Sequence, residues 1–87
     1  MSDVIDNKAE SRFELSVDGS MAFAEYSISG GTIHFTHTET PSALQGKGVA
    51  SKLIGAALTS AKERGLEIVP RCSFVAEYIA RHPEFRS

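Results

Sequence analysis

The sequence has few of the residues that mark secreted, metal-binding or membrane-spanning proteins. Its one cysteine cannot form an internal disulfide or a cysteine-rich zinc cluster, and a single cysteine fits a reducing compartment. The longest strictly apolar run, residues 21–24, is far shorter than the ~18 residues that suggest a membrane span. Because the amino terminus also lacks the basic-then-apolar pattern of a signal peptide, we expect a cytoplasmic protein that does not enter a membrane.

Length and composition predict one small globular domain. The chain has 87 residues, of which 41% are hydrophobic and 23% are charged, an ordinary balance for a folded protein. The first nine residues are polar, so we expect a flexible tail followed by a domain at residues 10–87. Residues 1–44 carry seven acids and two bases, whereas residues 45–87 carry four acids and seven bases. The basic half is either ordinary surface variation or a site for an anionic ligand.

The first part of the chain predicts three antiparallel strands. Residues 12–17 alternate polar and apolar side chains, residues 22–28 follow after a turn at 18–19, and residues 32–39 follow after a second glycine turn. The expected faces of the second and third strands are Ala22, Ala24, Tyr26 and Ile28, and Ile33, Phe35, His37 and Glu39. The expected aromatic core residues are Phe13, Phe23 and Phe35.

The second part of the chain changes to helical spacing. Apolar residues recur every three or four positions between 50 and 61, which predicts an amphipathic helix that stops near Gly65. Residues 66–69 predict a short buried strand, and residues 74–79 predict a second helix that ends before Pro83. The expected fold class is therefore α+β, with a mostly antiparallel sheet and a β-α-β-α carboxyl-terminal half.

A glycine-rich turn joins the third strand to the first helix. Gly46 and Gly48 lack Cβ atoms, so a bulky anion can approach the backbone closely. The start of the following helix offers unpaired N–H groups and partial positive charge, and Lys47 and Lys52 add formal charge. The turn therefore predicts a phosphate site, unless its glycines serve only to permit a tight, flexible turn.

The spacing excludes two common phosphate-binding motifs. The turn lacks the G-x-x-x-x-G-K-[ST] pattern of nucleoside triphosphate-binding loops. A dinucleotide-binding turn needs a third glycine inside a β-α-β unit, whereas Ser51 stands at that position. The preceding strand also belongs to an antiparallel meander, which is the wrong context for dinucleotide binding.

The pattern Gln45-x-x-Gly48-x-Ala50 resembles the Q/R-x-x-G-x-G/A motif of the GCN5-related N-acetyltransferases. In that family the motif binds the pyrophosphate of coenzyme A (CoA). The resemblance extends over about residues 11–85 and is to a small, stand-alone branch of the family. It implies a reduced acetyltransferase fold, in which the third and fourth strands splay apart and acetyl-CoA inserts its pantetheine arm between them.

The resemblance also implies where the ligands bind. The residues implied to bind acetyl-CoA are Thr38, Thr40, Gln45, Gly46, Lys47, Gly48, Val49, Ala50, Ser51, Lys52 and Phe74. The chain has no room for the early helices that shape the acceptor pocket in larger acetyltransferases. The acceptor site is therefore open, shared with a partner chain or absent, and a homodimer is left open.

Four residues are candidates for the chemistry. Cys72 precedes the second helix beside Arg71, and both surroundings favour the thiolate; it would accept the acetyl group, line the site, or be a small buried residue. His37 and Glu39 are two positions apart on one strand and would act as a base, or else pack and pair structurally. Tyr78 lies where larger family members protonate the departing thiolate, or it packs in the core.

Two functions from different classes stay open at this stage. One is an N-acetyltransferase acting on an unidentified amine, either a small molecule or a protein lysine. The other is a CoA-binding module without its own acceptor site. The net charge of −2 makes nucleic acid a weak alternative. No metal is expected, because His34 and His37 are not at metal-site spacing and no carboxylate cluster accompanies them.

Overall fold

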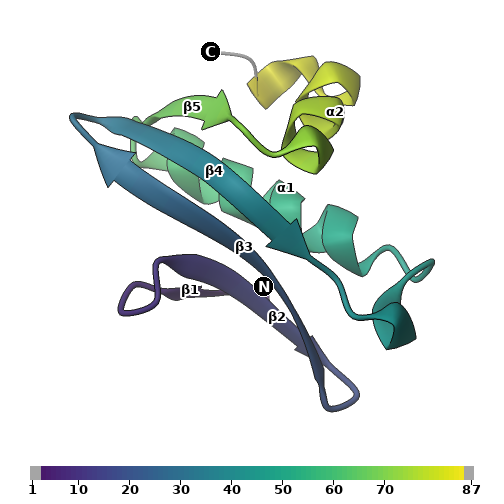
Figure 1. Ribbon diagram of the computed structural model, residues 1–87. Coiled ribbons are helices and arrows are strands. Elements are labelled where there is room, and N and C mark those ends of the chain that lie inside the picture. The colour runs from purple at the N-terminus through teal and green to yellow at the C-terminus, as the bar shows by residue number, and fades with distance from the viewer. Residues whose placement is uncertain (1–2, 86–87) are drawn as a thin grey trace.

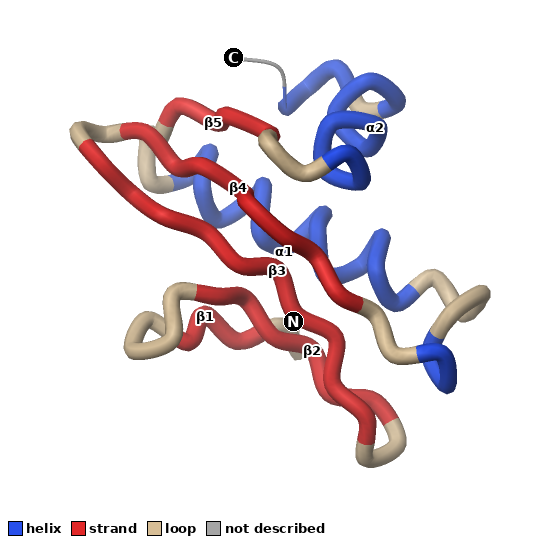
Figure 2. Tube along the Cα trace, viewed as in Figure 1, coloured by secondary structure: helices blue, strands red, loops and turns tan. Residues whose placement is uncertain are grey.

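The computed structural model describes residues 3–85, which form a five-stranded sheet with two α-helices (Figure 1; Figure 2). The elements are β1 (Ile5–Asn7), β2 (Arg12–Val17), β3 (Ser20–Ser29), β4 (Thr32–Glu39), η1 (Ser42–Leu44), α1 (Val49–Glu63), β5 (Glu67–Pro70), α2 (Ser73–Arg81) and η2 (Pro83–Phe85). The strands lie in chain order, antiparallel from β1 to β4, while β4 and β5 are parallel. The mixed α+β fold class is confirmed.

The two helices and one face of the sheet enclose the core. In Figure 1, α1 passes behind the sheet, and α2 lies beside β5. The predicted apolar stripe of α1 is buried, except that Ala50 is half-buried. Gly65, at φ +71°, ends this helix: its N–H donates to the carbonyl of Lys62, and the N–H of Leu66 donates to that of Ala61. Within residues 3–85, no helix combines the length and apolar character needed to cross a membrane.

Residues 5–7, which were expected to belong to a flexible tail, form the edge strand β1. They pair with β2 through Ile5↔Glu14 and Asn7↔Arg12. Three residues with a polar pattern are too few for alternation to be recognised in the sequence. The strand is held by tertiary contacts instead, and residues 1–2 lie outside the described part of the chain.

Phe23 was expected in the core, and this prediction is wrong. Ala22 and Ala24 point into the core and are fully buried, so Phe23 between them lies on the opposite, helix-free face of the sheet. The guanidinium of Arg12 stands 4.8 Å from the centre of the Phe23 ring. The ring is therefore half-covered by a cation instead of by apolar neighbours.

The prediction that His37 and Glu39 share a face with Phe35 is wrong, because β4 contains a β-bulge. Tyr26 of β3 pairs with Phe35, but the preceding residue Glu25 pairs with His37, so Thr36 is the extra residue. Phe35 points into the core as expected, whereas His37 points to the helix-free face. The bulge also brings Thr38 onto the core face, because Thr38 pairs directly with the buried Ala24 of β3.

Candidate functional site

The parallel strands β4 and β5 separate halfway along β4. Their last paired residues are Phe35 and Pro70, and the N–H groups of Arg71 and Cys72 both donate to the carbonyl of Phe35 at 3.0 Å. Beyond this point the chain turns into α2, while β4 continues to Glu39 and stays paired with β3 (Figure 2). Among the described strands, none pairs with the other edge of residues 36–39. One wall of this wedge between β4 and the start of α2 is a strand edge that no described strand covers.

The glycine turn lies at the open end of the wedge, against a cavity of about 380 Å³. The cavity is lined by Thr40, Leu44, Gln45, Gly46, Gly48, Val49, Ala50, Ser51 and Phe74. Leu44 is buried and anchors the turn to the core, and the Gln45 side-chain amide donates to the Thr40 carbonyl at 3.1 Å. We call this hollow the turn cavity.

The start of α1 faces the turn cavity without a cap. Gly48 is the N-cap residue at φ +73°, a left-handed conformation that strains any other side chain, and no side chain caps the helix. The N–H groups of the first helical turn have no acceptor within the helix. A Cβ atom built on Gly46 or Gly48 would meet nothing within 4 Å, so the space over the turn is open. These features fit a phosphate group.

Cys72 is held in contact with Thr38 across the wedge. The Cys72 thiol is half-buried and is hydrogen-bonded to Thr38 Oγ1, 3.4 Å from Sγ. When the thiol ionises, the Thr38 hydroxyl becomes the donor of this hydrogen bond. Burial raises the pKa of this thiol, but hydrogen bonds from Thr38 and from the N–H groups of Val75 and Phe74 outweigh burial and lower the pKa below its ordinary value. Arg71, which was expected to favour the thiolate, is exposed and is not among the causes of this shift.

His37 and Glu39 lie together on the other face of the same strand. His37 Nε2 and Glu39 Oε1 are 4.0 Å apart, and both side chains are more than half exposed. The ring of His37 is also 6.2 Å from that of Phe23. The structure therefore brings two of the four chemical candidates together here, and it places Cys72 and Thr38 on the opposite face of β4.

The pattern of residues has a counterpart among known families. A family model described as GCN5-related N-acetyl-transferase matches residues 12–87. The chain belongs to this acetyltransferase family. Membership implies an acyltransferase that uses acetyl-CoA, and it agrees with the sheet, the splayed strands and the glycine turn described above. The match begins at β2, so the edge strand β1 lies outside it.

Tyr78, the candidate acid of this acetyltransferase, is engaged in packing between the helices. A Cβ atom on Gly55 of α1 would stand 2.7 Å from the Tyr78 hydroxyl oxygen, which shows how closely that hydroxyl covers the glycine. The Tyr78 ring stacks on the His82 ring at 4.0 Å between centres, and His82 Nδ1 is 2.9 Å from the Tyr78 carbonyl oxygen. Burial, followed by the charge of Glu84, raises the pKa of Tyr78.

Part of the uneven charge is used within the fold. Lys52 Nζ is 3.4 Å from an Asp3 carboxylate oxygen, and Arg64 is 3.4 Å from Asp6, so two bases of the second half pair with acids of the first. The Lys52–Asp3 pair is exposed and contributes little to stability. Lys47 beside the glycine turn is exposed. These pairs support the interpretation of ordinary surface charge for part of the asymmetry.

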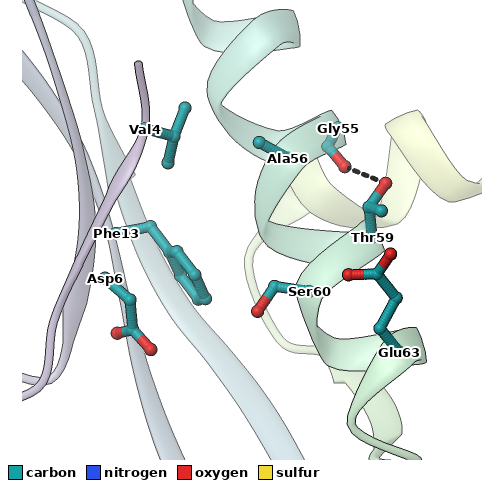
Figure 3. Close-up of a pocket in the computed structure, with 8 residues that line it drawn as sticks. All are labelled: Val4, Asp6, Phe13, Gly55, Ala56, Thr59, Ser60 and Glu63. Atoms are coloured by element: carbon teal, nitrogen blue, oxygen red, sulfur yellow. Dashed lines mark hydrogen bonds between the residues drawn. The ribbon is translucent and has the colours of Figure 1, made fainter. Parts of the chain in front are cut away.

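A second large hollow, of about 450 Å³, lies between β1 and α1 and was not anticipated from the sequence (Figure 3). Asp6 and Glu63 approach it from opposite walls, with Phe13 between the strand and the helix (Figure 3). Two of the polar groups there are already bonded: Thr59 donates to the Gly55 carbonyl at 2.8 Å, and Asp6 accepts from Tyr26 at 2.6 Å. Among residues 3–85, no group of three or more acidic, histidine or cysteine side chains is placed to hold a metal.

Proposed function

We propose that this protein is an acetyl-CoA-dependent N-acetyltransferase that transfers an acetyl group to an amine. The observation that carries the proposal is the uncapped first turn of α1, whose N–H groups open onto the turn cavity. Such a helix start attracts phosphate through its unpaired donors and its partial positive charge. Family membership supports acetyl-CoA as the phosphate compound.

The donor acetyl-CoA would occupy the turn cavity and the wedge together. Residues 46–51 would hold its pyrophosphate with backbone N–H groups, and Lys47 and Lys52 would add positive charge. The free edge of residues 36–39 would pair with the amide groups of the pantetheine arm, as an added strand pairs with a sheet. This orientation directs the thioester toward the closed end of the wedge, where Cys72 contacts Thr38.

Acetyl transfer needs a neutral amine, a polarised carbonyl and a proton for the departing thiolate. The pair His37 and Glu39 would take the proton from the ammonium form of the acceptor, directly or through water. In a direct route, the amine attacks the thioester carbon, a C–N bond forms, the C–S bond breaks, and the CoA thiolate takes a proton. Tyr78 is a candidate for that proton, although its hydroxyl contact with Gly55 favours packing.

The second route transfers the acetyl group in two steps, through a covalent intermediate on Cys72. The Cys72 thiolate would attack the thioester carbon, so that acetyl-Cys72 forms and the CoA thiolate leaves with a proton from solvent. The amine then attacks acetyl-Cys72, and the cysteine thiolate is regenerated. The lowered pKa of Cys72 supports this route, because only the thiolate is nucleophilic.

A CoA-binding module without its own acceptor site is the second candidate function. It is favoured by one observation: in the described part of the chain, α1 is the first α-helix, so no earlier helix stands over the free face of the sheet to wall an acceptor pocket. His37 and Glu39 are both exposed on that face. In a module, these side chains would be surface residues with no catalytic role.

Titration of the protein with CoA and acetyl-CoA, followed by amide NMR, tests both functions. We expect shifts at residues 45–52 and at 36–39, because both segments would contact the ligand. If neither ligand moves these amides, the acetyltransferase and the module are both excluded. Incubation with acetyl-CoA and a panel of small amines and lysine peptides then separates the two, since a module makes no acetylated product. Intact mass after acetyl-CoA alone reveals acetyl-Cys72, and full turnover by Cys72→Ala would exclude the covalent route.

A further inference from the structure

The hollow between β1 and α1 lies outside the proposed acetyl-CoA site. None of its lining residues lines the turn cavity, and two of them, Val4 and Asp6, precede residue 12, where the family match begins. Its volume of about 450 Å³ is within the range of about 300–1,000 Å³ that is common for small-molecule sites. The family resemblance assigns no ligand to this hollow, so the indication must come from its own side chains.

Short side chains of α1 keep the hollow open. Gly55, Ala56 and Ser60 line it from the helix, whereas Val4 and Phe13 line it from the side of the sheet. The Phe13 ring is directed into the space between strand and helix (Figure 3), and only 3% of this residue is exposed. The middle of the hollow is therefore apolar, and a longer side chain at Ala56 would fill it.

Polar groups reach the hollow from both walls. The Asp6 and Glu63 carboxylates approach from opposite sides, and the Ser60 hydroxyl is directed toward the same space (Figure 3). The two Asp6 oxygens have one partner each, the Tyr26 hydroxyl at 2.6 Å and the Arg64 guanidinium at 3.4 Å, and a carboxylate oxygen accepts about two hydrogen bonds. The Glu63 carboxylate has no hydrogen-bond or ion-pair partner among residues 3–85. Acceptors are therefore available to a ligand on both sides.

The charge of the hollow favours one positive charge in the ligand. No lysine, arginine or histidine is among its lining residues. Arg64 pairs with Asp6 and balances much of its charge, whereas no described side chain of opposite sign pairs with Glu63. An anion would be repelled, and a neutral ligand would displace water from Glu63 without replacing its hydrogen bonds. A primary ammonium group carries one charge and three N–H donors, which match two carboxylates and a hydroxyl.

We propose that the hollow between β1 and α1 binds a small primary alkylammonium compound, with the two carboxylates and Ser60 accepting from the ammonium group and the apolar walls contacting its short chain. This inference goes beyond the proposed function and does not rest on it, because the hollow shares no lining residue with the turn cavity. The site is also separate from the proposed acceptor side, since His37 and Glu39 lie on the opposite, helix-free face of the sheet.

Amide NMR titration with n-butylammonium chloride tests the inference. We expect saturable shifts at Asp6 and at residues 59–63, because both walls of the hollow would contact the ligand. Two related compounds at equal ionic strength test the role of charge: n-butanol should bind about tenfold more weakly, and butyrate should leave these amides unshifted. A titration with sodium chloride alone corrects for the general effect of salt.

Two pairs of variants locate the ligand. Glu63→Gln should weaken butylammonium binding about tenfold, through the loss of one charge-assisted contact. Glu77→Gln removes an equal charge from an exposed position of α2, outside the hollow, and should leave the affinity unchanged. Ala56→Leu fills the apolar middle and should abolish the saturable shifts. Ala80→Leu adds the same side chain at an exposed position of α2 and should have no effect.

Three results would overturn the inference. If n-butanol binds as tightly as butylammonium, or if Glu63→Gln keeps the wild-type affinity, the hollow does not recognise an ammonium group. Shifts confined to residues 36–39 would place the amine at the wedge instead. Glu63 is exposed, so Glu63→Gln should melt like the wild type and decides the question even if Ala56→Leu does not fold. Failure of CoA to bind would exclude the proposed function alone, because the two sites share no lining residue.

Discussion

The two ends of the sheet use their polar groups in opposite ways. At the β1 end, the Tyr26 hydroxyl donates to Asp6 at 2.6 Å, and Asp6 also pairs with Arg64 of the segment that ends α1. Glu14 nearby accepts from both Arg12 and Asn7. At the carboxyl end of β4, the first turn of α1 has no cap, and residues 36–39 have one edge without a partner among the described strands. The polar side chains named at the β1 end bond to one another. The N–H groups at the start of α1 and the strand edge of β4 are left for a ligand.

The difference shows why cavity size alone does not identify the site. The hollow between β1 and α1 is larger than the turn cavity, at about 450 Å³ against about 380 Å³. Of its two carboxylates, Asp6 is already bonded to Tyr26, whereas the turn cavity is walled by the N–H groups of a helix start without a cap. In a small domain, unsatisfied backbone groups beside open space are the stronger indication of ligand binding.

The largest effect expected on ligand binding is that of Gly48→Val. The valine side chain would fill the open space over the turn and block close approach of the pyrophosphate to the backbone. Loss of one or two charge-assisted hydrogen bonds predicts CoA affinity weaker by about tenfold to a hundredfold. Isothermal titration measures the change.

Gly65→Val is the matched control for Gly48→Val. Gly65 stands at the other end of the same helix, has φ +71° against +73° for Gly48, and likewise has nothing within 4 Å of a Cβ atom. Both variants should lose about 1–2 kcal/mol of stability through the same backbone strain, but only Gly48→Val should lose CoA affinity. Equal affinities in the two folded variants would show that the turn does not bind the ligand.

The second largest effect is a loss of stability in Tyr26→Phe, at the β1 end of the sheet. Removal of the hydroxyl breaks the hydrogen bond to the Asp6 carboxylate and should cost about 1.5 kcal/mol of stability, measured by urea unfolding. Affinity for CoA should be unchanged. Any parallel loss of affinity would show that the two ends are coupled and would break the comparison.

The same tyrosine gives a pH dependence. Burial, and then the hydrogen bond to Asp6, raises the pKa of Tyr26 to about 12. A group whose pKa is raised by folding stabilises the folded state below its unfolded value, which is ~10 for tyrosine. That contribution is lost as the pH rises from there through the folded value. Tyr26→Phe should therefore show a flatter decline of stability in alkaline solution.

Much of this fold could be predicted from the sequence, because its signals are local. The strands at 12–17 and 32–39 alternate clearly, and the stripe of α1 has helical spacing throughout. The bulge at Thr36 and the short strand β1 could not be predicted, since both depend on pairing with distant residues. The bulge matters for the proposed function, because it decides which face of β4 carries His37 and Glu39 and which carries Thr38.

The candidate site was predictable in part for the same reason. The glycine turn is a continuous motif, and its position at the start of a helix follows from local spacing. The contact between Cys72 and Thr38 joins residues 34 positions apart and follows from the bulge and the parallel pairing of β5. The Tyr78 contact with Gly55 depends on how the two helices cross, for which the sequence contains no local signal.

A smaller effect is expected on the stability of the protein in acid, where the Glu14 carboxyl becomes protonated. Hydrogen bonds from Arg12 and then Asn7 lower the pKa of its carboxyl below the ordinary value. A carboxyl whose pKa is lowered by folding stabilises the protein above its unfolded value, ~4.3 for glutamate, and this stability is lost as the pH falls through the folded value. Glu14→Gln should lower stability at neutral pH, and the difference from wild type should disappear in acid. A constant difference at every pH would contradict the assignment.

The smallest effect is expected at the wedge, in the reactivity of Cys72. Thr38 provides the first of the hydrogen bonds that lower the pKa of the Cys72 thiol against the effect of burial. Thr38→Val keeps the shape but removes the hydroxyl, so the pKa should rise and less thiolate should be present at neutral pH. The pH midpoint for alkylation by iodoacetamide should therefore shift upward, and alkylation at neutral pH should slow.

Thr36→Val is the control for this change, because the Thr36 hydroxyl bonds to the Glu25 carbonyl at 3.4 Å and not to the cysteine. It should leave the alkylation midpoint of Cys72 unchanged. If both valine variants shift the midpoint equally, the cause is a general disturbance of β4 and not the hydrogen bond to sulfur. If neither does, the backbone N–H groups of Phe74, Val75 and Thr38, which both variants keep, are sufficient to hold the thiolate.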